Sequence, residues 1–191
     1  MLEKIERNEV SQKFKTYLYI VEGKINFINT RYPKCSGSHL KRLIEEAINN
    51  SEKYPLDKLS RWLGFTQGVL VSNNLLTINK DYDFKAQSNE SMNEKEKEAV
   101  QLLFPRYLVL IEDHKENICK KVRQFKADYL YSLCKDAVDN HENYSFNELS
   151  KRLGFVQGLL ATDGIIDVDE ERDFTRPILH AIHEFKIPTF K

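Results

Sequence analysis

Two segments of the chain, 90 residues apart, carry the same pair of glycines inside an apolar helical pattern. The first reads LSRWLGFTQGVL from Leu59 to Leu70, and the second reads LSKRLGFVQGLL from Leu149 to Leu160. With this offset and no gap, roughly 21 of the 71 pairs between residues 14 and 84 are identical. Such a repeat constrains the fold more than any single motif does. Because two copies are too few for a solenoid, the sequence predicts a tandem duplication that folds into a pseudo-twofold helical bundle.

Helical spacing of apolar residues, with only 7 Gly and 5 Pro, predicts an all-α fold. In the first unit we expect helices over about 2–31, 38–50 and 56–72. Ser38 is the expected N-cap of the second of these helices.

In the second unit we expect a break near Phe104, because Pro105 removes a helical hydrogen bond. Gly164 suits the left-handed turn that ends a helix, and Asp167 should cap a last helix that reaches Phe185. We therefore divide the chain into a first helical repeat at 1–84, a linker at 85–93, and a second repeat with a C-terminal extension at 94–191.

The glycines belong to a row of small residues at four-residue spacing on each motif helix. The two rows are Ser60, Gly64, Gly68 and Ser72, and Ser150, Gly154, Gly158 and Thr162. Four interior glycines cost about 3–4 kcal/mol of helix propensity relative to alanine, so a close contact must offset this. Either the backbone of another helix packs into the row, or a ligand lies against the bare backbone. Gln67 and Gln157 border the rows, where each amide could form an interhelical hydrogen bond or bind a polar ligand.

The charge balance and the cysteines limit the classes of function. Lys+Arg 29 equals Asp+Glu 29, which argues against a general nucleic-acid binder. Cys35, Cys119 and Cys134 form no CxxC pair, which favours reduced thiols in a cytoplasmic protein. No signal-peptide pattern and no membrane-length apolar run are visible, so we expect no membrane partner.

No motif for catalysis or metal binding stands out. The stretch TDGIIDVDEE resembles half of a calcium loop, but the first ligands would fall at Leu159 and Ala161. His180 and His183 share a helix face without a third ligand nearby, and Ser60 has no matching histidine. We predict no cofactor, no metal and no catalytic residue.

Basic residues distinguish the second unit from the first. Arg172 and Arg176 lie four apart and could clamp a phosphate, or could pair with Asp173 and nearby acids at the surface. Trp62 and Arg152 occupy equivalent positions, so one unit presents an aromatic ring where the other presents a cation.

The strings YPLDKLSRWLGFTQGVL and DVDEERDFTRP, the latter followed by His180, together resemble the signature of a family of small phage-encoded accessory proteins. The usual form carries the whole signature in a single unit, whereas here it is divided between two. The resemblance implies a composite site across the pseudo-dimer. Some phage proteins of this class are similar to small helical oligomers that sequester nucleotide signals of antiviral defence, which implies an anti-defence role in the host cell cytoplasm.

We therefore expect a non-enzymatic binding protein that sequesters a small anionic ligand, with a nucleotide immune signal as the candidate. Two alternatives stay open: a protein–protein inhibitor or scaffold that acts on a host protein, and an unrecognised hydrolase. A homo-oligomer is a further expected partner. The pocket should lie between the motif helices and the last helix, with basic side chains on phosphate, aromatic rings on a base and glutamines on polar edges. The expected ligand-binding residues are Tyr54, Arg61, Trp62, Gln67, Lys151, Arg152, Gln157, Arg172 and Arg176.

Overall fold

The structure, a computed structural model, describes residues 2–28, 32–77, 79, 91–118 and 126–183. Every regular element in these ranges is a helix, so the all-α prediction is confirmed. The α-helices are α1 (Leu2–Lys24), α2 (Gly37–Asn49), α3 (Leu56–Ser72), α5 (Glu94–Asp113), α6 (Ala127–Asp139), α7 (Phe146–Thr162) and α8 (Val168–His183). Short 3-10 turns, η1 (Pro33–Cys35), η2 (Ser51–Lys53) and η3 (His141–Asn143), precede α2, α3 and α7. Most of the expected linker lies outside the described residues.

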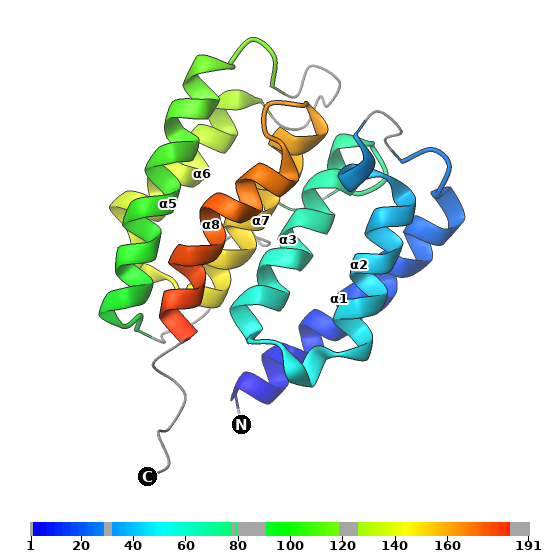
Figure 1. Cartoon of the computed structure of the whole chain (residues 1–191), viewed down its shortest axis with the longest axis horizontal. Coiled ribbons are helices and arrows are strands. Elements are labelled where there is room, and N and C mark those ends of the chain that lie inside the picture. Colours follow the sequence, from blue (N-terminus) through cyan, green and yellow to red (C-terminus); the bar gives the residue numbers. More distant parts are fainter. Residues whose placement is uncertain (1, 29–31, 78, 80–90, 119–125, 184–191) are drawn as a thin grey trace.

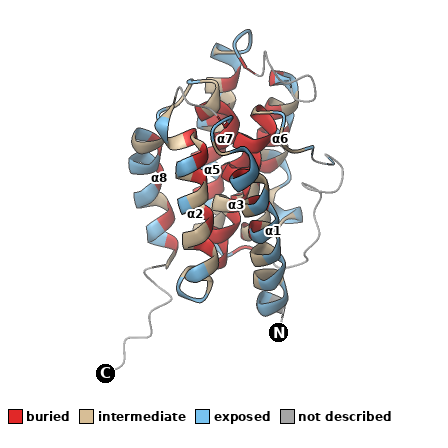
Figure 2. Cartoon of the chain, turned by 90° about the vertical axis from the view of Figure 1, so that its right-hand side faces the viewer, coloured by how far each residue is buried: buried red, intermediate tan, exposed pale blue. Residues whose placement is uncertain are grey.

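The two motif helices, α3 and α7, form the most extensive helix–helix interface of the described chain. Figure 1 shows α1 and α2 on one side of this pair and α5 and α6 on the other, with α8 between α5 and α3. Buried residues concentrate where the helices face one another, and exposed residues lie on the outer faces (Figure 2). We refer to α1 to α3 as the first half and α5 to α8 as the second half.

Each half has its own hydrophobic core, and the two motif helices join the cores. Phe14, Tyr17 and Leu63 belong to the first, and their equivalents Phe104, Tyr107 and Leu153 belong to the second. Val71 of α3 packs into the core of the second half, while Ala161 of α7 packs into that of the first. Positions 71 and 161 are also 90 residues apart, so the exchange is reciprocal.

The glycine rows face each other across the α3–α7 interface. A Cβ atom on Gly64 would lie 1.9 Å from the carbonyl oxygen of Lys151, and one on Gly154 would lie 2.0 Å from that of Arg61. Gly68 and Gly158 meet the carbonyl oxygens of Phe155 and Phe65 in the same way, at 2.5 and 2.4 Å.

No side chain fits at such distances, so of the two alternatives left open by the sequence, the glycines lie against the backbone of another helix. The contacts advance in the same direction along both helices, which therefore run parallel. They also repeat at the 90-residue offset, as an approximate twofold relation would produce. A common origin of the two halves stays a prediction.

Several expected boundaries differ from the structure. The first helix ends at Lys24 rather than near residue 31, because a turn follows in which Phe27 donates its amide to the carbonyl of Lys24. The N-cap of α2 is Ser36 rather than Ser38, since its hydroxyl oxygen accepts the amide of His39 at 3.3 Å.

The expected break at Pro105 is also wrong. α5 continues through the proline, because Phe104 and Tyr107 on either side are buried in the core and hold the helix in place. The expected cap of α8 is confirmed, since Asp167 Oδ1 accepts the amides of Asp169 and Glu170 at 2.8 and 3.1 Å. The left-handed turn at Gly164 is confirmed by its φ of 74°.

Candidate functional site

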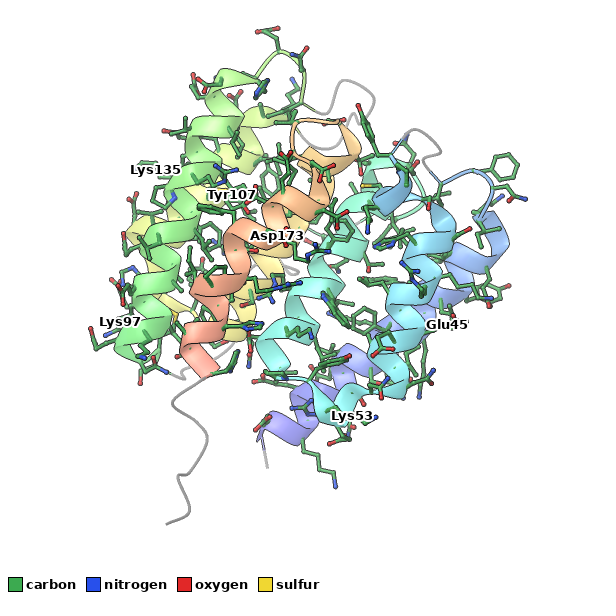
Figure 3. The ribbon with its side chains drawn as sticks, viewed as in Figure 1. Glu45, Lys53, Lys97, Tyr107, Lys135 and Asp173 are labelled. Carbon is green, nitrogen blue, oxygen red and sulfur yellow. The ribbon has the colours of Figure 1, made fainter. Side chains whose placement is uncertain are left out.

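A cavity of about 760 Å³ lies between α2, α3 and α8. Figure 3, in which Asp173 on α8 and Tyr107 on α5 are labelled, shows side chains of α8 and α3 pointing into the space between these helices. We call this cavity the basic cleft, because five of its lining residues are Lys or Arg and three are Asp or Glu. These charged residues are Lys34, Lys58, Arg61, Arg172 and Arg176, and Asp57, Asp169 and Glu171.

An ion pair crosses the cleft near each end of α8. His183 Nε2 lies 3.0 Å from Asp57 Oδ1 at the start of α3. Lys34 Nζ, in the turn before α2, lies 3.2 Å from Asp169 Oδ1. α8 is thus a wall contributed by the second half and fastened at both ends to the first half.

The cations on α8 differ in their partners. Arg172 is bound to acids of its own helix, at 2.7 Å from Asp169 and 3.1 Å from Asp173. The surface-pairing interpretation therefore holds for Arg172. The guanidinium of Arg176 makes no hydrogen bond or ion pair within the described parts of the chain.

Arg176 acts electrostatically on a lysine across the cleft. Burial lowers the pKa of Lys58, and the charges of Arg61 and Arg176 lower it further, against the opposing effect of Glu46 and Asp57. Two arginines, one on α3 and one on α8, therefore lie close enough to Lys58 to repel its ammonium.

Arg61 and Asp57 form a buried and incompletely hydrogen-bonded pair. Their side chains are 17% and 5% exposed, and Arg61 NH1 lies 3.7 Å from Asp57 Oδ2. Neither of these two atoms has a hydrogen-bond partner in the described structure. Burial lowers the pKa of Arg61. Burial would raise the pKa of Asp57, but the hydrogen bond and charge of His183, together with the charge of Arg61, hold it below its usual value.

An aromatic pair stands beside these charges. The rings of Tyr54 and Trp62 meet edge to face with centroids 5.1 Å apart. Lys58 Nζ lies over both rings, 3.8 Å from the Tyr54 centroid and 4.9 Å from the Trp62 centroid. Trp62 lines the cleft, whereas the Tyr54 hydroxyl donates to Glu46 of α2 at 2.5 Å. The predicted pair of aromatic residues is therefore adjacent, with a cation already on its faces.

The two glutamines hold the motif helices to their neighbours. Gln67 donates to the Tyr17 hydroxyl, and Gln157 donates to the Tyr107 hydroxyl, each at 2.7 Å. The interhelical hydrogen bond that we considered is present in both halves. Of the two, only Gln157 also lines the cleft. The Tyr107 hydroxyl donates a hydrogen bond in turn to the carboxylate of Glu171, which lines the cleft too.

Arg152 lies outside the cleft, although the sequence predicted it as a ligand. Its side chain is 3% exposed, and its NH1 donates to Asp136 Oδ2 at 2.7 Å and to the carbonyl of Leu133 at 3.1 Å. The guanidinium also covers the Tyr144 ring at 4.3 Å. Lys151 does not line the cleft either, and its carbonyl oxygen faces Gly64.

The structure thus brings Arg61, Trp62, Gln157, Arg172 and Arg176 together, with Tyr54 behind Trp62. Gln67, Lys151 and Arg152 lie elsewhere. The sequence analysis missed Lys34, His39 and Lys58 as lining residues. Lys58 could have been predicted from the sequence, because it lies one helical turn before Trp62 and therefore on the same face of the helix.

No protein-family model, curated protein or solved structure matches this chain. Within the described ranges, no group of three or more His, Cys, Asp or Glu residues is placed to hold a metal ion. None of the described helices is both long and apolar enough to cross a bilayer.

Proposed function

We propose that the chain binds a small polyanionic ligand, with a nucleotide as the candidate, in the basic cleft. The observation that carries this proposal is the position of Arg176, which has no acidic partner among the described residues and faces Lys58 and Arg61 across the cleft. Arg176 is exposed at the rim of the cleft, whereas Lys58 and Arg61 are half-buried, where like charges repel more strongly than at an open surface. An anion between the two walls would convert this repulsion into attraction.

The size and chemistry of the cleft fit such a ligand. Pockets for small molecules range from about 300 to 1,000 Å³, and this one measures about 760 Å³. Guanidinium groups bind phosphate oxygens bidentately, and an ammonium adds a mobile charge. The ring of Trp62 supplies an apolar surface beside the cations.

Sequestration of the ligand without turnover is the activity that we infer for this cleft. The removal of an immune signal in a host cytoplasm rests on the resemblance to phage accessory proteins alone. A hydrolase would use the same cleft, so product analysis distinguishes the two functions.

The test is a ligand screen by thermal shift and calorimetry with pyrophosphate, ATP, ADP-ribose and cyclic di-AMP. A ligand present at 100 times its Kd should stabilise the fold by about 2.7 kcal/mol. Arg176→Gln should weaken binding about tenfold or more, because it removes a charged hydrogen bond to phosphate. Lys135→Gln is the control for the loss of one positive charge, since Lys135 is exposed on α6 and does not line the cleft.

Absence of binding by every anion in the screen would refute the proposal. Equal affinities of the wild type and Arg176→Gln would refute the assigned site. Release of a hydrolysed product from a bound nucleotide would replace sequestration by catalysis.

A further inference from the structure

Lys58 occupies the aromatic surface that a nucleobase would need. Its ammonium nitrogen lies over the faces of Tyr54 and Trp62, at 3.8 and 4.9 Å from the ring centroids. Cation–π contacts of this kind hold an ammonium only weakly at partly exposed sites. The ammonium of Lys58 makes no hydrogen bond or ion pair within the described ranges.

The second half also has a cation over a tyrosine ring, although from another position, since Arg152 corresponds to Trp62 and Lys58 corresponds to Glu148. There the Arg152 guanidinium covers the Tyr144 ring at 4.3 Å, and Asp136 holds it by a 2.7 Å ion pair. Asp136 corresponds to Glu46, which accepts the Tyr54 hydroxyl but makes no ion pair with Lys58. The cation of the second half is therefore anchored by a carboxylate, whereas the cation of the first half can leave its rings.

We infer that Lys58 and a nucleobase exchange places: the phosphate of a nucleotide draws the ammonium off the rings, and the base stacks on Trp62. This inference rests on the proposed function and deepens it, because it specifies a ligand that carries both an anion and a flat aromatic ring. Phosphate is a stronger partner for an ammonium than a ring face is. The exposed ring surface then gains a stacking partner that it accepts without regard to base identity.

The exchange predicts cooperation between the two parts of the ligand. An inorganic anion would draw Lys58 away and leave the rings uncovered. A nucleoside alone would have to displace the ammonium without offering it a new partner. A nucleotide supplies a phosphate for Lys58 and a base for the Trp62 ring, so its affinity should exceed that of either part.

The neighbouring charges act on Lys58 in both directions. Arg61 and Arg176 repel its ammonium, whereas Glu46 and Asp57 attract it. An anion held by the two arginines would turn their repulsion into attraction, and the four flexible methylene groups of Lys58 allow the ammonium to follow. Trp62 is the only tryptophan of the chain, so its fluorescence reports on its own ring face.

The experiment compares pyrophosphate, ADP and GDP, adenosine and guanosine, by calorimetry and by Trp62 emission. We expect ADP and GDP to quench Trp62 and to bind about tenfold or more tighter than pyrophosphate, as the energy of one stacked base implies. Pyrophosphate should bind with little quenching, and both nucleosides should bind most weakly. Trp62→Leu should reduce the affinity for ADP to that for pyrophosphate.

Lys58→Gln provides the decisive variant. It should weaken ADP and pyrophosphate binding about tenfold, while adenosine binding stays the same or improves, because the ring face is no longer occupied. A merely structural role of Lys58 would weaken all three ligands alike. Lys24→Gln is the matched control, since its ammonium lies 5.7 Å from the Phe27 centroid, away from the cleft.

Pyrophosphate binding that depends on Arg176, without tighter binding of ADP or GDP and without quenching, would overturn this inference and leave the proposed function standing. Failure of every phosphate-bearing probe to bind would overturn both.

Discussion

Gly68 and Gly158 meet back to back at the centre of the molecule: a Cβ atom on either would lie 3.1 to 3.2 Å from the Cα atom of the other. Both glycines also lie against carbonyl oxygens of the facing helix. The helices can approach this closely only because neither residue has a side chain. The propensity cost of the glycines is thus offset by backbone packing along α3 and α7.

Gly64→Ala should destabilise the fold by about 2–3 kcal/mol, at the upper end of the range for overpacked core positions. The new methyl group would lie 1.9 Å from the carbonyl oxygen of Lys151, so the helices must separate. This loss should exceed the gain of about 1 kcal/mol in helix propensity. Urea denaturation gives the free energy of unfolding. Gly23→Ala is the control, because a Cβ atom there meets nothing within 4 Å; it should leave stability unchanged or raise it.

Arg152→Met should destabilise the fold by about 2–3 kcal/mol, because it removes a buried charge that is hydrogen-bonded to Asp136 and Leu133. Ligand affinity should not change, since Arg152 lies outside the cleft. Arg176→Gln should show the opposite pattern, with full stability and weakened binding. Parallel denaturation and calorimetry of the two variants measure both effects, and weaker binding by Arg152→Met would contradict this assignment.

Asp57→Asn should reduce the sensitivity of the fold to acid. The pKa of Asp57 in the folded chain lies below its ordinary value of 3.8. Its ionised form therefore stabilises the fold above about pH 4, and this contribution is lost as the pH falls through the lower folded-state pKa. Asparagine cannot titrate, and it is the residue at the equivalent position 147. The free energy of unfolding at pH 5 and pH 3 should differ less in the variant than in the wild type. Equal differences would show that Asp57 does not contribute.

Native-state thiol labelling should leave two cysteines unmodified. Cys35 and Cys134 are fully buried, and burial raises the pKa of the first to about 11 and of the second to about 12. The thiolate is the reactive form, so iodoacetamide at pH 8 should modify neither until the chain unfolds. Mass spectrometry of labelled peptides checks this, with urea-unfolded protein as the positive control. Rapid native modification of Cys134 would mean that the core of the second half opens.

The local sequence determined the motif helix well. α3 spans Leu56–Ser72 as the apolar spacing and flanking turn residues indicated. The end of α1 could not be found in this way, because helical spacing continues past Lys24 while the backbone turns. At Pro105 the local sequence indicated a break, but α5 continues because its tertiary packing overrides the effect of the proline.

The site was only partly predictable. Arg61, Trp62, Arg172 and Arg176 could be assigned because each pair lies close in sequence on a helix that borders the cleft. The role of Arg152 could not be assigned, because its partners Leu133 and Asp136 lie on α6, which folds against α7. Lys34 and His39 enter the cleft from other elements, so only the tertiary structure places them there.

Because α3 and α7 pair in parallel within one chain, equivalent positions on the two helices can be substituted independently. In an assembly of two identical chains, every substitution appears on both sides of the axis. Here position 58 holds lysine where position 148 holds glutamate, and position 62 holds tryptophan where position 152 holds arginine. The first half can therefore keep a lysine over two aromatic rings while the second half keeps an arginine paired with Asp136. Because the two halves are encoded in one chain, equivalent positions can carry different residues.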